Sequence, residues 1–163
     1  MQSKGSFDPQ NANYSSVNKM IEIVLIKSDE LHSAFAIMNQ LRMHLSLEEF
    51  IERVAYQREH EAYHLAGLWD DGRLCSVAGF REMTNLACGK IIYVDDLVTD
   101  KGCRGRGHGA ALLGWIGDFA TQRGCTQVHL DSGVQRHDAH RFYLRERMDI
   151  VYFHFMKKIE NQG

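Results

Sequence analysis

The sequence predicts a single α/β domain of three layers, with its elements in the order β-α-α-β-β-β-α-β-α-β. Three observations lead to this prediction. The chain has 163 residues, of which 44% are hydrophobic, which is enough for one well-packed core and too little for two domains of ordinary size. Short β-branched runs alternate along the chain with longer amphipathic segments. A glycine-rich loop joins one of these runs to an Ala/Leu-rich helical segment.

Residues 1–19 are expected to lie outside this domain. They are rich in Ser, Asn and Gln, contain the single proline of the chain at Pro9, and show no hydrophobic periodicity. Such a composition does not bury enough apolar surface to fold. We therefore interpret residues 1–19 as a disordered tail or an expression remnant, and residues 20–163 as one domain.

The first half of the domain combines strand-like runs with two helical segments. Ser46 and Glu49 have the spacing of a capping box, which opens a helix. The sequence DDG over residues 70–72, between two apolar runs, is typical of a hairpin turn. The elements expected here are a strand over 21–26, helices over 29–44 and 46–60, and a hairpin of strands over 63–69 and 74–83.

The second half alternates between strands and helices. Leu112, Trp115, Ile116 and Phe119 form an i, i+3, i+4, i+7 stripe, which is the core face of an amphipathic helix. Gly124 then supplies a residue for the left-handed position that ends many helices. The elements expected here are strands over 90–99, 126–131 and 150–156, and helices over 107–122 and 137–147.

The loop before helix 107–122 is the most informative segment. It has the sequence CRGRGHGA over residues 103–110. Glycines at alternate positions allow a tight turn that exposes several N–H groups to one point, and the following helix adds the positive end of its dipole. Arg104, Arg106 and His108 add cationic character. These features predict a binding site for a diphosphate.

Two other phosphate-binding patterns fit this loop less well. The nucleoside-triphosphate P-loop places Lys and Ser or Thr after its last glycine, where this chain has alanines. The dinucleotide pattern is matched loosely by Gly105, Gly107 and Ala110, and Asp131 follows at the distance of a ribose-binding acid. However, only 32 residues follow Asp131, which is too few for a doubly wound sheet. An NAD(P)-binding protein is therefore a remote alternative.

The chain from residue 91 onward resembles the GNAT superfamily of N-acetyltransferases. The pattern RxxGxG over residues 104–109 resembles the loop that binds the pyrophosphate of acetyl-CoA in that family. Residues 94–99 resemble its fourth strand, and AHRFY over residues 139–143 resembles its A-x-x-F-Y helix signature. The resemblance implies a mixed, mostly antiparallel central sheet flanked by helices, and an enzyme that uses acetyl-CoA as acetyl donor.

By this resemblance, the donor lies along the fourth strand and the glycine loop. Backbone groups of the strand pair with the pantetheine arm, and one N–H faces the thioester oxygen. The resemblance implies no metal. The cofactor-binding residues that it implies are Leu97, Val98, Thr99, Arg104, Gly105, Arg106, Gly107, His108, Gly109 and Ala110.

Acetyl transfer to an amine also needs a group that accepts a proton from the nucleophile. Asp95 and Asp96 are adjacent carboxylates in an otherwise apolar strand. Strand alternation places them on opposite faces unless a bulge intervenes, so which of them acts as the base stays open. Burial in a cleft raises the pKa of a carboxyl group, which suits a general base. The pair resembles the Glu-Asp of several small-molecule acetyltransferases of the superfamily, and a helix cap or loop anchor is the structural alternative.

Tyr143 matches the family tyrosine whose hydroxyl protonates the departing thiolate of CoA. A core aromatic is the alternative interpretation, because Tyr143 shares a helical face with Ala139 and Phe142. The sequence departs from the family after this residue, since Arg147 and Met148 stand where Gly-Phe is usual. We expect this departure to change the end of the helix, because a left-handed residue is unfavourable without glycine.

The predicted function is transfer of an acetyl group to a primary amine of a small molecule by direct attack in a ternary complex. Protein or peptide acceptors, and a non-catalytic acyl-CoA-binding module, are the alternatives. The formal net charge of −2 argues against a nucleic-acid or anionic-membrane surface. The oligomeric state is open, and the resemblance favours a homodimer through the C-terminal strands.

The cysteines and histidines show no metal-binding spacing. His137 and His140 can share a helical face, but no third ligand is evident near them. No apolar secretory segment is present at the N-terminus. We therefore expect a cytoplasmic protein with reduced thiols at all four cysteines, which are Cys75, Cys88, Cys103 and Cys125.

Overall fold

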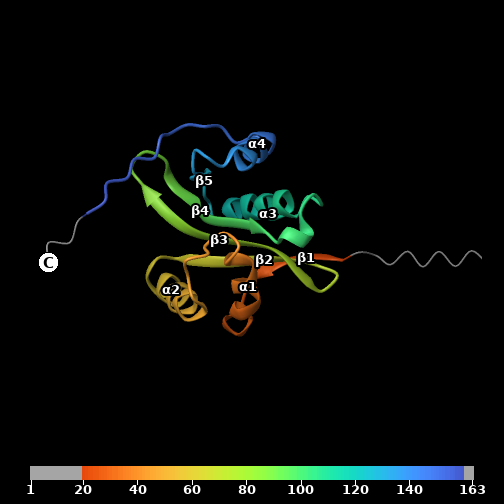
Figure 1. Cartoon of the computed structure of the whole chain (residues 1–163). Coiled ribbons are helices and arrows are strands. Elements are labelled where there is room, and N and C mark those ends of the chain that lie inside the picture. The colour runs from red at the N-terminus through yellow and green to blue at the C-terminus, as the bar shows by residue number, and fades with distance from the viewer. Residues whose placement is uncertain (1–19, 160–163) are drawn as a thin grey trace, which may run out of the picture.

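Five strands form one mixed sheet in the computed structural model, which describes residues 20–159 (Figure 1). Their order in the sheet follows the chain, and β1 to β4 pair antiparallel whereas β4 and β5 are parallel. The predicted fold class is confirmed, and the doubly wound parallel sheet of a dinucleotide-binding fold is excluded. The strands are β1 (Ile21–Leu25), β2 (Tyr63–Asp70), β3 (Arg73–Asn85), β4 (Gly89–Thr99) and β5 (Val128–Leu130).

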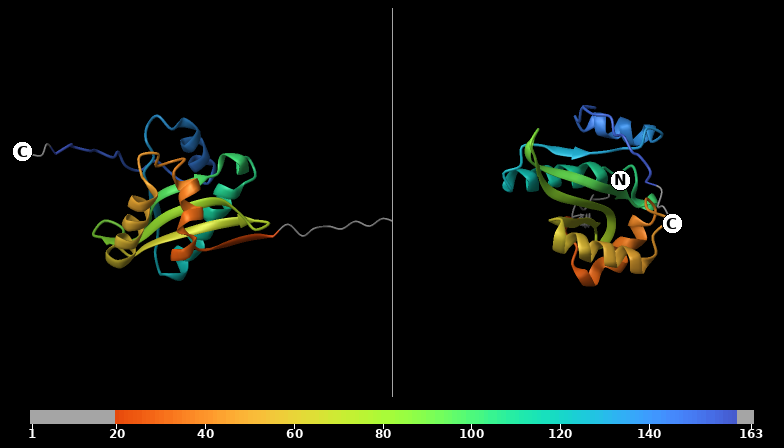
Figure 2. Two further views of the ribbon diagram at one scale, coloured as in Figure 1. Left: turned by 60° about the horizontal axis from the view of Figure 1, so that its bottom comes forward. Right: turned by 90° about the vertical axis from the view of Figure 1, so that its left-hand side faces the viewer.

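Within the described residues, four α-helices cover the two faces of this sheet. α1 and α2 lie on one face, and α3 and α4 lie on the other, which gives the expected three layers (Figures 1 and 2). Short 3-10 turns precede α1 and α3. The helices are α1 (Leu31–Met38), α2 (Leu47–His60), α3 (His108–Gln122) and α4 (His137–Arg145), and the 3-10 turns are η1 (Ser28–Glu30) and η2 (Lys101–Cys103).

Local sequence explains where the helices begin and end. At the start of α2, the Glu49 N–H donates to the Ser46 hydroxyl at 3.2 Å and the Ser46 N–H donates to the Glu49 carboxylate at 2.8 Å, which is the predicted capping box. After α3, Gly124 adopts φ of +71°, the left-handed conformation expected there. α1 is shorter than predicted, because i→i−3 hydrogen bonds from Gln40 and Leu41 tighten the chain after Met38.

The sheet separates two apolar cores. Phe50 of α2 belongs to the core beneath α1 and α2, and Phe80 of β3 and Ile116 of α3 belong to the core beneath α3. On β4, Val98 packs into the first core and its neighbour Leu97 packs against the second. Consecutive residues of β4 therefore face opposite sides of the molecule, as strand alternation requires.

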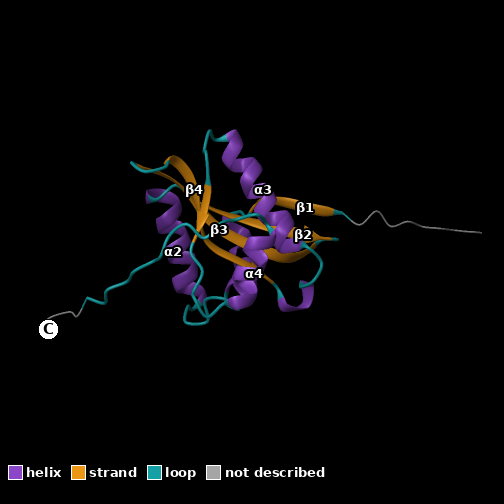
Figure 3. Ribbon diagram, turned by 90° about the horizontal axis from the view of Figure 1, so that it is seen from above, coloured by secondary structure: helices purple, strands orange, loops and turns teal. Residues whose placement is uncertain are grey.

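The segment 150–156, predicted as a strand, has no regular secondary structure. It follows α4 and runs past the end of the sheet (Figures 1 and 3). Its apolar side chains are exposed, with Phe153 and Phe155 at 84% and 90%. Its apolar sequence fits a strand, but a strand also needs a neighbouring edge with which to pair. The prediction is therefore wrong for the single chain.

The prediction of four reduced thiols is also wrong. Cys75 of β3 and Cys103 of η2 form a disulfide, whereas Cys88 and Cys125 are free. The two partners meet because the chain turns back onto β3 after β4, where the Asp100 N–H donates to the Cys75 carbonyl at 2.9 Å. This long-range contact leaves no spacing signal in the sequence. The cytoplasmic location, which relied partly on reduced thiols, stays a prediction.

Two further expectations concern the ends and surfaces of the chain. The tail predicted over residues 1–19 lies outside the described residues. Between residues 20 and 159, no helix combines the length and the apolar character that crossing a membrane requires.

Candidate active site

The glycine loop leads from η2 into α3 with two left-handed residues. Gly105 and Gly107 have φ values of +76° and +79°, a region that side chains disfavour. No atom lies within 4 Å of the point where a Cβ would stand on either glycine, so the loop is open on that side. Gly107 is also the N-cap of α3. The loop and the positive end of the helix dipole therefore face one place, which is the arrangement that binds an anion.

A cleft of about 960 Å³ opens beside this loop, and we call it the loop cleft. Helix α4 forms its opposite wall, with Arg136 and Tyr143 among the lining residues. Val98 and Arg106 do not line it. The Val98 side chain packs in the core beneath α1 and α2, and Arg106 is exposed to solvent. The remaining predicted cofactor residues line the cleft, namely Leu97, Thr99, Arg104, Gly105, Gly107, His108, Gly109 and Ala110.

The edge of β4 beside the loop cleft is not covered by β5. The parallel pairing of the two strands ends at Val94 and Leu130. In the described part of the chain, residues 96–99 of β4 pair with β3 and have no partner on β5. An extended ligand can pair with such a strand edge through backbone hydrogen bonds.

A β-bulge in β4 sets the positions of the two aspartates. Gly79 of β3 pairs with Asp96 and Phe80 pairs with Val94, so Asp95 is the additional residue. Strand alternation had placed the two carboxylates on opposite faces unless a bulge intervened, and the structure contains that bulge.

A second cleft of about 680 Å³ lies between β4 and α2, and we call it the α2 cleft. Arg42, Arg53, Tyr63 and Asp96 are among its lining residues. Asp96 is followed directly by Leu97, which lines the loop cleft. Consecutive residues of β4 therefore line the two clefts, and β4 serves as their common wall.

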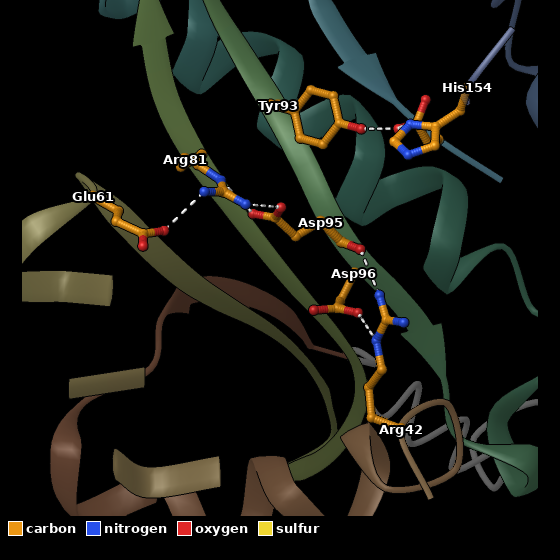
Figure 4. Close-up of polar contacts among 8 residues, drawn as sticks. Arg42, Glu61, Arg81, Tyr93, Asp95, Asp96 and His154 are labelled. Carbon is orange, nitrogen blue, oxygen red and sulfur yellow. Dashed lines mark hydrogen bonds and ion pairs between the residues drawn. The ribbon is translucent and has the colours of Figure 1, made fainter. Parts of the chain in front are cut away.

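The two aspartates differ in how their oxygens are bound (Figure 4). Both carboxylate oxygens of Asp95 accept hydrogen bonds from Arg81, at 3.0 and 2.5 Å, and Arg81 also donates to Glu61 at 2.8 Å. Asp96 accepts through Oδ1 from Nε of Arg42 at 2.6 Å. Asp95 is thus held by a bidentate ion pair, whereas Asp96 has a single bond to an exposed arginine.

Burial affects the titration of three groups around the clefts. It raises the pKa of Asp96, whose side chain is 16% exposed, and the nearby Arg42 guanidinium opposes this effect. Burial also raises the pKa of Tyr143, with Arg136 acting in the opposite direction. The pKa of Tyr63 is raised by burial and by the charges of Asp96 and Asp95. Asp96 is therefore suited to accept a proton, and the two phenols keep theirs.

The structure corrects the role predicted for the His108 side chain. The ring is buried, and its nitrogens lie 3.1 Å from the Cys103 carbonyl oxygen and 3.1 Å from Asp70 Oδ2. It therefore points into the fold beneath the loop, and it does not add mobile positive charge to the face of the loop. The prediction that the backbone N–H of His108 helps to bind the diphosphate is unaffected.

The expected change at the end of α4 is also corrected. Arg147 adopts the left-handed conformation that glycine usually takes, with φ of +63°. The Met148 N–H donates to the Tyr143 carbonyl at 3.0 Å and the Arg147 N–H donates to the Leu144 carbonyl at 3.1 Å. These two bonds form a complete Schellman motif. The geometry of the helix end is thus retained, with arginine in an unfavourable conformation.

Asp131, which had been considered as a ribose-binding acid, has partners within the protein. It accepts a hydrogen bond from the Tyr93 hydroxyl and pairs with Nδ1 of His154 at 2.7 Å (Figure 4). These contacts link the end of β5 to the C-terminal segment and give no support to a dinucleotide site.

Sequence reasoning missed Arg42, Arg81 and Tyr63, because they come from separate elements and match no motif. One signal for Tyr63 was present. Gly79 interrupts an apolar strand, and a glycine there often marks a close approach. A Cβ on Gly79 would lie 2.0 Å from the Tyr63 hydroxyl oxygen, so the glycine makes room for this tyrosine.

A glycine loop at a helix N-terminus, beside a strand edge left open, is the arrangement that the resemblance to N-acetyltransferases implies for the donor site. Residues 29–148 match the sequence model of the acetyltransferase (GNAT) family, and the chain therefore belongs to that family. It is 34% identical over 119 residues to the uncharacterised N-acetyltransferase YhdJ of Bacillus subtilis (strain 168), covering 73% of this chain and 84% of that protein. The protein is therefore an acyltransferase, and its family uses acetyl-CoA.

Two further comparisons cover different ranges. The chain is 38% identical over 66 residues to the aminoalkylphosphonate N-acetyltransferase of Salmonella typhimurium (strain LT2), covering 40% of this chain and 43% of that protein. It superposes on the aminoglycoside N-acetyltransferase AAC(6')-Iy, solved in complex with CoA, with a TM-score of 0.78 over 86% of this chain and 95% of that one. Sequence identity in the second case is 11%, so that likeness shows the fold alone.

Proposed function

We propose that the protein transfers the acetyl group of acetyl-CoA to a primary amine of a small molecule, by direct attack in a ternary complex. The observation that carries this proposal is that Asp96 and Leu97, consecutive residues of β4, line the two clefts. A donor in the loop cleft and an acceptor in the α2 cleft would meet where β4 has no β5 partner in the described chain. Such juxtaposition is the main requirement of a direct transfer.

Asp96 is the proposed general base. Asp95 is less suited to this role, because both of its oxygens are bound by Arg81. Asp96 has a raised pKa and one oxygen outside its bond to Arg42, so it can take the proton that the attacking amine must lose. The new bond joins the amine nitrogen to the acetyl carbon, and the carbon–sulfur bond breaks.

The residues of the loop cleft would hold the donor and receive the leaving group. Acetyl-CoA supplies the activated thioester. The N–H groups around Gly105 and Gly107 bind the diphosphate, and a backbone N–H of residues 97–99 faces the thioester oxygen. Tyr143, which lines the cleft and keeps its proton, donates that proton to the departing thiolate.

The charges of the α2 cleft favour an amine that also carries an anionic group. Asp96 and Glu61 can face an ammonium, while Arg42 and Arg53 can face an anion. The relative that is named for aminoalkylphosphonates makes such compounds the first members of an acceptor panel. Peptides with a free N-terminus form the competing group of the same panel.

We also propose a homodimer in which residues 150–159 of one copy cover the β5 edge of the other. β5 is the last strand in the sheet order and an edge strand readily accepts another strand. Light scattering should report a dimer for the wild-type chain and a monomer for Phe153→Asp/Phe155→Asp. A monomeric wild type would contradict this part of the proposal. The exposed apolar residues of this segment are Ile150, Val151, Tyr152, Phe153, Phe155, Met156 and Ile159.

The proposed function is tested by two measurements on the purified chain. Thermal denaturation should show a higher midpoint with acetyl-CoA and with CoA, and no change with NAD⁺ or NADPH, because a ligand of the native state stabilises it. Thiol release should then appear with an amine of the panel. Binding of CoA without thiol release from any amine or peptide would contradict the proposed transfer.

A further inference from the structure

Beneath the glycine loop lies a buried histidine–aspartate pair that the proposed reaction does not use. Asp70, the last residue of β2, lies 3.1 Å through Oδ2 from Nε2 of His108, the first residue of α3. The side chains are 4% and 1% exposed. The other ring nitrogen, Nδ1, lies 3.1 Å from the carbonyl oxygen of Cys103. One imidazole thus links the end of β2 to both ends of the loop.

The partners of His108 fix where hydrogen atoms must lie. The Cys103 carbonyl oxygen can only accept, so Nδ1 carries a hydrogen. Nε2 lies at hydrogen-bond distance from Oδ2 of Asp70. Taking two such groups out of water is unfavourable, so a buried pair of this kind is weak evidence for a purely stabilising role. The position of the pair beneath the loop therefore says more about its role than its contribution to stability does.

The pair clamps a segment that would otherwise be loose. Residues 104–107 lie between Cys103 and His108, and two of them are glycines in the left-handed region. Glycine makes this backbone possible, but it also leaves the unbound loop many alternatives. Cys103 is held to Cys75 and His108 is held to Asp70, so both ends of the loop are tied to the sheet.

We propose that the side chains of His108 and Asp70 are positioning groups for acetyl-CoA, and that they hold the loop N–H groups in the diphosphate-binding arrangement without themselves touching the ligand. This inference rests on the proposed function, since it assumes that the loop binds acetyl-CoA. A preorganised loop loses less conformational freedom when the donor binds, so the pair increases affinity for the donor. It has no part in the transfer step.

A metal site is the competing interpretation of the same cluster. One ligand atom each of Cys75, Cys103 and His108 lies within 4.8 Å of the others, and all three residues are buried. However, the two sulfurs are joined, and both nitrogens of His108 already face protein oxygens. The observed bonds therefore favour a clamp over a ligand set.

The test compares Asp70→Asn, His108→Gln and the double variant in the full chain. Each single variant should raise the dissociation constant of CoA about tenfold, as loss of a hydrogen bond to a charged group implies. The double variant should be no weaker than the singles, because both changes release the same clamp. The kcat at saturating acetyl-CoA should stay at the wild-type value while KM for acetyl-CoA rises.

His64→Gln is the matched control. His64 is also a β2 residue close to a carboxylate, with Nε2 3.5 Å from Glu82 Oε1, but it lines neither cleft. The affinity of this variant for CoA should equal that of the wild type. Thermal midpoints of all variants separate a loss of affinity from a loss of folding.

Four results would overturn the inference. Unchanged CoA affinity in folded single variants would reduce the pair to a structural contact, and additive effects would show that the two side chains act separately. If the variants fail to fold, NMR of the wild type still tests the clamp. The Nδ1 hydrogen of His108 must be protected from exchange with water, and rapid exchange would contradict the inference. Stoichiometric zinc in the purified protein would favour the metal site. A wild type that does not bind CoA would instead refute the proposed function.

Discussion

The loop cleft and the α2 cleft share β4 as a wall, yet they are built in different ways. The loop cleft depends on backbone: left-handed glycines, a helix N-terminus and an open strand edge. The α2 cleft depends on side chains from several elements, joined by ion pairs such as Arg42 to Asp96. A backbone site requires glycines at fixed positions, whereas a side-chain site can be assembled in many ways. The loop cleft is therefore suited to a ligand that stays the same, and the α2 cleft is suited to a ligand that varies.

The largest expected effect separates the chemistry of the α2 cleft from binding in the loop cleft. Asp96→Asn should lower kcat about 10²- to 10⁴-fold, the usual contribution of a general base. Calorimetry should give an unchanged affinity for CoA. Asp95→Asn is the paired variant, and it should lose less activity because Asp95 is assigned to holding Arg81. Equal losses in both variants would contradict the assignment of the base.

Asp96→Asn should also have a pH-dependent effect on stability. The folded-state pKa of Asp96 is raised, so the native state holds this proton more tightly than the unfolded state. The wild type is therefore favoured below the unfolded pKa and loses this contribution as pH rises through the folded pKa. The stability of the variant relative to the wild type should grow from pH 4 to pH 7 in chemical denaturation. A constant difference would show that burial does not disfavour the charge.

Tyr143→Phe tests the opposite wall of the loop cleft. Removing the hydroxyl should lower kcat about ten- to a hundredfold, which is the worth of a hydrogen bond to a charged group. The affinity for acetyl-CoA should be retained, because the ring still fills its place. Tyr93→Phe removes a hydroxyl bound to Asp131 outside both clefts, and it serves as the control. Unchanged turnover in Tyr143→Phe would leave this tyrosine a packing role.

The loop cleft can also be disturbed through its backbone. Gly107→Val forces a β-branched residue to φ of +79°, which costs about 1–2 kcal/mol. We expect weaker binding of CoA, measured by calorimetry, together with a lower thermal midpoint. Gly114→Ala in the same helix is the control, because no atom lies within 4 Å of its added Cβ and its φ is not left-handed. Wild-type affinity in Gly107→Val would refute the backbone site.

This contrast explains what the sequence could predict. The fold class, the capping box of α2 and the glycine loop all follow from local patterns, and the structure contains each of them. The ion pairs of the α2 cleft could not be predicted, because Arg42 and Asp96 are 54 residues apart and match no spacing rule. The Cys75–Cys103 disulfide and the buried ring of His108 were missed for the same reason. The strand over 150–156 failed because its sequence pattern says nothing about a partner edge.

The smallest expected effect lies at the end of α4. Arg147→Gly should raise the free energy of unfolding by about 1 kcal/mol, because glycine adopts φ of +63° without strain. Chemical denaturation measures the difference, and kcat should not change, since Arg147 lines neither cleft. Arg145→Gly, two residues earlier at the last position of α4, should instead destabilise the protein. Destabilisation by Arg147→Gly would mean that the arginine side chain adds more to the free energy of unfolding than its left-handed backbone conformation takes away.

The change from Asp96 to Leu97 within one strand has a consequence for how such an enzyme can diversify. Under the proposed function, neighbouring residues of β4 face different molecules, because their side chains point to opposite faces of the sheet. Substitutions around α1 and α2 can thus alter the choice of acceptor while the donor site keeps its shape. New activities can arise on one side of the strand without rebuilding the other, and a laboratory library confined to the α2 cleft should retain acetyl-CoA binding in most of its folded members.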